Sequence, residues 1–154
     1  MRSRVAGCAS RCLRRCEARL ARATTDVSAF RSWNDVEPHT LFPGVGLRAI
    51  GGEQVLLCHV TYEPGTTVRR HSHETAEQVM WIIEGNVTMT VGDETKRLGA
   101  GDVVVVNPGI EHELHSENGL TFIEALAPVL RDHVPNAERD LVLGAQGDSL
   151  HSEG

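Results

Sequence analysis

Three histidines in two short motifs carry the chemistry that this sequence suggests. His71 and His73 are separated by one residue, and His112 follows the apolar run that begins after Gly101-Asp102. Because side chains alternate faces along an extended strand, the first two imidazoles point the same way, and a second strand would supply the third. Imidazole nitrogen is a borderline donor suited to several divalent ions, so the pattern predicts a metal site.

Short strands must position these histidines. Gly, Pro and Asn turn signals, among them Glu84-Gly85-Asn86, separate nearly all of the segments rich in β-branched residues. Many short strands at this spacing predict an all-β sandwich or barrel with little helix. The expected strands are Val45–Ile50, Gln54–Glu63, Thr66–Arg70, Gln78–Ile83, Asn86–Val91, Thr95–Leu98, Val103–Val106, His112–His115 and Leu120–Ala127.

The composition divides the 154 residues into one domain with tails. Residues 1–24 hold seven arginines and one acid, Glu17, which is typical of a processed leader or of a start codon assigned too far upstream. Residues 25–46 contain two prolines and read as an arm, residues 47–128 form the barrel, and residues 129–154 form an irregular tail. A helical leader would align Cys8, Cys12 and Cys16, although their spacing is unusual for a metal site.

Charge and hydropathy exclude several classes of function. The chain has 15 basic and 21 acidic residues, so the part after residue 24 keeps eight basic against twenty acidic ones. An acidic body argues against binding to nucleic acid, which needs clusters of Lys and Arg. No segment has the roughly 20 apolar residues of a membrane span or the apolar core of a secretory signal, so we expect a cytoplasmic protein. Cys58 reads as a small buried hydrophobe.

The two motifs resemble those of the cupin superfamily, small double-stranded β-helix barrels, over about residues 45–128. Gly65, His71, His73 and Gly85 match the first motif, G-x5-H-x-H with a later Gly. In the second motif, Gly101-Asp102, Gly109 and His112 match, while Asn107 replaces the first proline. Gln78 stands where most cupins have Glu. The resemblance implies an all-β cupin jelly-roll barrel with irregular N- and C-terminal tails.

A subset of cupins with Gln at this position implies the metal ligands His71, His73, Gln78 and His112. The metal would be Zn, Ni, Fe or Mn, with one or two coordination positions left to water or substrate, as catalytic sites require. Because the Gln oxygen is neutral, the ion keeps more positive charge and is the stronger Lewis acid. The alternative ligand is Glu77, whose side chain points to the opposite face of the strand.

The last predicted strand is similar to that of cupins that linearise unsaturated sugar acids. Those proteins carry an acid, then Phe, Pro and Arg; here Glu124 is the acid, Leu126 replaces Phe, and Arg131 is displaced by one residue. Glu124 lies among apolar residues, so desolvation should raise its pKa toward the range useful for proton transfer. Glu124 is therefore the candidate catalytic acid or base. The alternative is that Glu124 is an ordinary strand residue whose carboxyl is solvated or hydrogen-bonded.

These residues predict a metal-dependent enzyme that acts as a Lewis acid on a small carbonyl or enol substrate. Isomerase, lyase or cyclase chemistry fits, with sugar-acid linearisation and polyketide cyclisation as examples from the family. The alternatives are an Fe(II)-dependent dioxygenase and a non-catalytic cupin that binds a small molecule. We expect a homodimer in which the arm extends the partner's sheet. Weaker site candidates are Arg48, Tyr62, Trp81, His59 and His115, whereas His39, His133 and His151 match no motif.

Overall fold

The computed structural model describes residues 28–142. The expected leader, its three cysteines and His151 lie outside the described residues. The strands are β1 (His39–Phe42), β2 (Val45–Gly51), β3 (Leu56–Tyr62), β4 (Thr66–His71), β5 (Glu77–Val91), β6 (Glu94–Gly99), β7 (Val103–Val106), β8 (His112–Ser116) and β9 (Leu120–Ala127). Three single helical turns complete the elements: η1 (Trp33–Asp35), η2 (Arg131–His133) and α2 (Ala137–Asp140).

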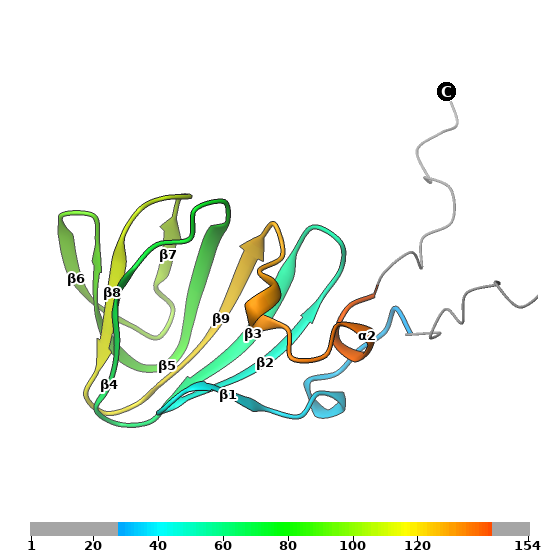
Figure 1. The fold of residues 1–154 in the computed structure, drawn as a ribbon. Helices are drawn as coiled ribbons and strands as arrows, with labels where there is room; N and C mark the ends of the chain where they lie inside the picture. Colours follow the sequence, from blue (N-terminus) through cyan, green and yellow to red (C-terminus); the bar gives the residue numbers. More distant parts are fainter. Residues whose placement is uncertain (1–27, 143–154) are drawn as a thin grey trace, which may run out of the picture.

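The strands form one antiparallel sheet that curls on itself (Figure 1). The strand order is β1-β2-β3-β9-β5-β8-β4, and β5 also pairs with β6 and β7. Each of β3 and β9 alternates buried and more exposed residues, so one face of each strand looks into the barrel. The all-β barrel predicted from the turn spacing is confirmed.

The core fills the interior of the curled sheet. Its largest fully buried side chains include Leu47, Leu56, Met80 and Ile82, and Phe122 packs edge to face on Tyr62 with ring centroids 5.4 Å apart. Cys58 is completely buried among them, as its apolar surroundings suggest. The core therefore lines the same interior that receives the inward side chains of β5 and β9.

One long strand replaces two of the predicted ones. Residues 77–91 run continuously as β5, with a register shift against β9 between Ile82 and Glu84, so the expected turn at residues 84–86 is wrong. Gly85 has φ +87°, and a Cβ there would collide with the Gly119 carbonyl oxygen. The unpaired extra residue is Ile83, two positions before Gly85; the part of β5 before this bulge pairs with β7 and the part after it with β6.

The segments flanking the barrel are more ordered than expected. Residues 39–42 of the arm form β1, which pairs with β2 of the same chain. After β9 the chain forms η2 and α2, and Leu141, 2% exposed, pairs with Gly51 at the end of β2. This C-terminal segment thereby packs back on the barrel.

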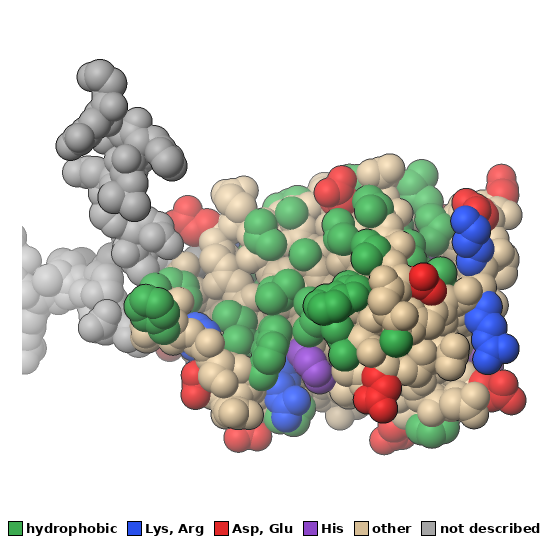
Figure 2. Space-filling model, turned by 180° about the vertical axis from the view of Figure 1, so that it is seen from behind, with side chains coloured by type: hydrophobic (Ala, Val, Ile, Leu, Met, Phe, Trp, Pro, Cys, Tyr) green, Lys and Arg blue, Asp and Glu red, His purple; other side chains and the backbone are tan. Residues whose placement is uncertain are grey.

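Hydrophobic side chains also lie on the outer surface of the barrel. Figure 2 shows them gathered on the face seen from behind. Among the described residues no helix is long and apolar enough to cross a membrane.

Candidate metal centre

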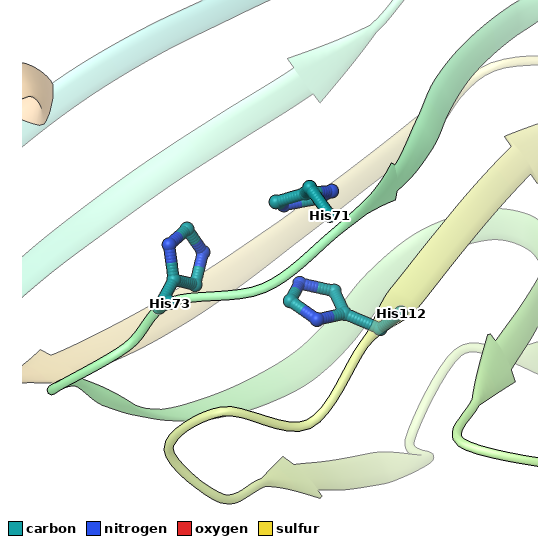
Figure 3. A group of neighbouring side chains, drawn as sticks. All are labelled: His71, His73 and His112. Carbon is teal, nitrogen blue, oxygen red and sulfur yellow. The ribbon is translucent and has the colours of Figure 1, made fainter.

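Three imidazoles from two neighbouring segments meet inside the barrel (Figure 3). His71 ends β4, His73 follows in the connection to β5, and His112 begins β8. Residues 71 and 112 are paired across β4 and β8, with ring centroids 4.2 Å apart. One nitrogen of each of the three rings lies within 4.8 Å of the others, which is close enough for a shared metal ion.

Backbone hydrogen bonds orient the rings. Nδ1 of His71 donates to the carbonyl of Arg69 at 2.8 Å, and Nδ1 of His112 donates to the carbonyl of Ile110 at 3.1 Å. Because a carbonyl only accepts, the proton of each neutral ring sits on Nδ1, and Nε2 keeps its lone pair. The loop that bears His73 is tied to the second motif by a hydrogen bond from Gly109 N to His73 O of 2.8 Å.

The environment of His73 and His112 favours their neutral, metal-binding form. Burial, then the neighbouring imidazoles of His71 and His112, lower the pKa of His73 to about 4. Burial also lowers the pKa of His112, which is completely buried. Neutral imidazoles can accept a metal ion near pH 7 without first losing a proton.

Gln78 lines the same cavity from β5. Its side chain is 6% exposed, whereas the neighbouring Glu77 lies on the exposed side of the strand. Nε2 of Gln78 donates to Oε2 of Glu124 at 2.5 Å, so the amide oxygen Oε1 is turned away from that carboxylate. Within the described part of the chain, Oε1 of Gln78 and Nε2 of His112 are buried without a hydrogen-bond partner.

These two atoms, buried without a hydrogen-bond partner, show whether the cavity suits a metal ion. A buried acceptor without a partner costs about 1 to 3 kcal/mol, so two in one small cavity favour a bound group that accepts their lone pairs. Both are electron-pair donors of the kind that divalent transition metals accept. The residues present therefore fit a divalent ion held by His71, His73 and His112, with Gln78 positioned to add an oxygen.

Glu124 reaches the cavity from β9. Its side chain is 4% exposed, and burial raises the pKa of its carboxyl, while the charge of His133 and hydrogen bonds from Gln78 and the Cys58 thiol act in the opposite direction. Burial, then the Glu124 charge, raise the pKa of Cys58 and that of Tyr62. The carboxyl thus occupies an apolar site next to the imidazoles.

The C-terminal segment adds a residue that the sequence motifs missed. His133, on η2, is 9% exposed and lines the cavity, and its ring centroid lies 6.0 Å from that of His73. Its Nδ1 pairs with Oδ1 of Asp132 at 2.9 Å. No sequence pattern near residue 133 indicated this, because the contact depends on how the segment after β9 folds back.

The other candidates lie elsewhere. Trp81 is 51% exposed on the outer face of β5, as its register relative to Gln78 predicts. His115 is exposed and hydrogen-bonded to Thr67, and the ring of His59 packs at a tilt of 52° against Trp33 with ring centroids 5.8 Å apart. Arg48 donates to the carbonyl of Val36. Of the weaker candidates only Tyr62 lines the cavity, which has a volume of about 40 Å³.

Comparison with known proteins agrees with this architecture. Residues 58–123 match the family described as a cupin domain. An RmlC-like cupin from Shewanella frigidimarina aligns with 70% of this chain and 96% of its own, at 22% identity and a TM-score of 0.66. KdgF from Halomonas sp. aligns with 68% of this chain and 98% of its own, at 19% identity and a TM-score of 0.64.

One curated relative is the tetracenomycin polyketide synthase protein TcmJ of Streptomyces glaucescens. It is 25% identical over 72 residues, which are 47% of this chain and 48% of TcmJ, so the match spans about half of either protein. The strand order, the three-histidine centre and the match over residues 58–123 agree with one another. The chain has the cupin fold, and residues 58–123 match the cupin domain family.

Proposed function

We propose that this cupin is a metal-dependent enzyme that acts on a small substrate bearing a carbonyl or enol oxygen. The observation that carries the proposal is the donor set: three imidazoles, with the amide oxygen of Gln78, which is buried without a hydrogen-bond partner, as the fourth donor. None of these four donors is anionic, so a bound divalent ion keeps its full charge and polarises a substrate oxygen as a Lewis acid.

Glu124 is the group that moves the proton in this proposal. Isomerisation, lyase and cyclisation reactions next to a carbonyl all need a proton taken from one atom and returned to another. Burial raises the pKa of the Glu124 carboxyl, which makes it a better proton acceptor than an exposed carboxylate. Its Oε2 holds Gln78, so its other oxygen is the one that serves the substrate.

His133 is a second residue on the substrate side. Nδ1 of His133 donates to Asp132, which leaves Nε2 as the ring nitrogen available to a substrate in the cavity. We assign it the binding of a substrate hydroxyl. His133→Ala should therefore raise KM while the metal content stays unchanged, and loss of the metal in this variant would show a structural role instead.

The size of the cavity limits what reacts there. A volume of about 40 Å³ holds the reacting oxygen and a few neighbouring atoms, so the rest of the substrate must extend through the mouth. The resemblance of the last strand to that of cupins that linearise unsaturated sugar acids supports a sugar acid, and the likeness to the polyketide synthase protein TcmJ supports a polyketide. Of these two, the acid at position 124 favours the sugar acid.

The test is turnover of unsaturated uronates by zinc- or nickel-loaded protein under argon, followed as loss of their ultraviolet absorbance. We expect turnover that Gln78→Ala and His73→Ala abolish while the circular dichroism spectrum is kept. His115→Ala, a histidine change outside the cavity, should retain it. Full activity in metal-free protein would refute the proposal, and strict dependence on iron and O2 would favour a dioxygenase.

A linear polyketide is the second substrate to assay. Ring closure under argon with the same dependence on metal and Gln78 would keep the Lewis-acid mechanism and change the substrate class. Tight binding of either compound without turnover, measured as a thermal shift, would instead favour a non-catalytic binding cupin.

A further inference from the structure

A second cavity lies between the edge strands β6 and β7, which Figure 1 shows on the side of the molecule far from α2. Each of these strands is paired with β5 alone, β7 with its first part and β6 with its second part. We name this space the side cavity. Its volume is about 240 Å³, against about 40 Å³ for the metal cavity, and none of the described residues lines both.

The register of β5 and β6 sets which side chains face the side cavity. Met89 is paired with Lys96, and Val91 with Glu94. Directly paired residues point to one side of a sheet, and Met89 is 2% exposed within the core. The charged side chains of Glu94 and Lys96 therefore stand on the inner face of the sheet and look into the gap between β6 and β7.

Val91 separates the side cavity from the metal centre. It is paired with Glu94 on β6 and with His112 on β8, so the three side chains form one row across the inner face of the sheet. A molecule in the side cavity would lie on one side of Val91, and the imidazole of His112 lies on the other. Occupation of the side cavity is therefore independent of a metal ion at the three histidines.

The side cavity is apolar inside and charged at its mouth. Its inner walls are formed by four hydrophobic side chains that belong to the core or pack against it: Met89, Val91, Leu98 and Val104. At the mouth, Nζ of Lys96 lies 2.6 Å from Oε1 of Glu94, and the two side chains are 67% and 70% exposed. Apolar walls with a few charged groups that fix orientation are typical of sites for small molecules.

We propose that the side cavity binds a small apolar α-amino acid, such as leucine or methionine. Its volume is roughly eight times the share of one water molecule in the liquid, which suits a ligand of this size. The carboxylate of the amino acid meets Lys96 and its ammonium group meets Glu94, while the aliphatic side chain fills the apolar interior.

The charges at the mouth select a zwitterion over singly charged ligands. A simple carboxylic acid would bring its negative charge beside Glu94, and a simple amine would bring its positive charge beside Lys96. Like charges placed together oppose binding, whereas a zwitterion gives each of the two residues an opposite partner. The ion pair of Glu94 and Lys96 therefore matches the head group of an amino acid.

The same charges argue against an added β-strand as the occupant. Charged residues that point inward from an edge strand block its pairing with another strand. A strand added beside β6 would have to place its own side chains against Glu94 and Lys96. The gap between β6 and β7 is thus suited to a small molecule.

Titration of leucine into the nitrogen-15-labelled full chain, followed by NMR, tests the proposal. We expect saturable shifts of the amides of Met89, Leu98 and Val104, with a dissociation constant in the millimolar range because the charges at the mouth are exposed. Absence of these shifts up to the solubility limit of leucine would overturn the proposal. Shifts confined to His71, His73 and their neighbours would overturn it too, because leucine would then be chelating an ion at the metal centre.

Substitutions at the mouth test the two charges. Lys96→Ala and Glu94→Ala should each weaken the binding of leucine about three- to tenfold. Both side chains are exposed, so the variants should keep the circular dichroism spectrum of the wild type. Arg97→Ala is the matched control, because Arg97 lies on the same strand but is paired with Thr88 on the outer face, and its affinity should be unchanged. Wild-type affinity in both Lys96→Ala and Glu94→Ala would contradict the site.

Analogues of leucine test the class of ligand. The compound 4-methylpentanoic acid lacks the ammonium group, 3-methylbutylamine lacks the carboxylate, and serine lacks the aliphatic chain. Each should bind at least about threefold more weakly than leucine. Equal or tighter binding of 4-methylpentanoic acid or of 3-methylbutylamine would overturn the assignment to an amino acid.

Discussion

Nε2 of Gln78 donates a hydrogen bond to Oε2 of Glu124 at 2.5 Å, inside the barrel and beside the three imidazoles. A carboxylate accepts hydrogen bonds, so it selects the NH2 side of the amide and leaves the oxygen for the cavity. Two residues 46 positions apart therefore act together: Glu124 sets the orientation of Gln78, and Gln78 in turn helps to hold the buried carboxyl.

Two substitutions at Glu124 should separate positioning from proton transfer. Glu124→Gln keeps an oxygen that accepts from Gln78, so metal affinity should stay within about threefold while turnover is lost. Glu124→Leu removes the acceptor, and metal affinity should fall by about 10- to 100-fold, as for other groups that orient metal ligands. Competition titration with a chelating dye gives the affinities. Full turnover in Glu124→Gln would show that another group moves the proton.

Gln78→Glu should destabilise the metal-free protein, because two carboxyls would face each other in a site that now holds one. The cost in unfolding free energy should be about 1 to 3 kcal/mol, measured with urea. The double variant Gln78→Glu/Glu124→Gln restores one carboxylate facing one amide and should recover most of that loss. Additive effects of the two substitutions would contradict the contact.

Gly85 should tolerate no side chain. Gly85→Ala introduces a Cβ at φ +87° against the Gly119 carbonyl, so we expect a loss of about 2 to 3 kcal/mol in unfolding free energy. Gly92→Ala is the control: its φ is +59°, but its Cβ would meet nothing within 4 Å, and about 1 kcal/mol should be lost. Equal losses in urea unfolding would mean that the close approach of β5 to Gly119 does not matter.

The sequence predicted most of the strands on either side of this part of β5. Strand β7 (Val103–Val106) and β9 (Leu120–Ala127) were predicted with the bounds observed, since β-branched runs between turn residues leave few alternatives. The turn predicted at Gly85 was wrong because a glycine with positive φ can stand within a continuous strand, here two residues after the bulge at Ile83, as well as in a turn. Local sequence does not distinguish the two.

The sequence likewise predicted part of the metal centre, namely its three histidines. His71, His73 and His112 lie together because strand register fixes them, and the spacing of the two motifs contains that register. His133 and the link from Gln78 to Glu124 were not predicted. Both depend on which distant segments pack against each other, which no periodic pattern near residues 78, 124 or 133 records.

Metal-free protein should lose stability as the pH falls below about 6.5. Burial lowers the pKa of His39 and that of His59 from 6.5, so in this range the unfolded chain binds protons that the folded chain does not. The unfolding free energy then decreases with falling pH. His59→Gln should show a shallower decrease between pH 6.5 and 5.5 in urea unfolding. An unchanged slope in this variant would contradict the assignment.

The metal content of purified protein tests the central claim most directly. After equilibration with zinc, nickel, manganese or ferrous ions and removal of free metal, elemental analysis should find one ion per wild-type chain with at least one of these metals. His112→Ala removes the fully buried imidazole and should abolish retention, whereas His115→Ala should leave it unchanged. A wild type that retains no metal, or a His112→Ala variant that retains as much as the wild type, would contradict the three-histidine centre.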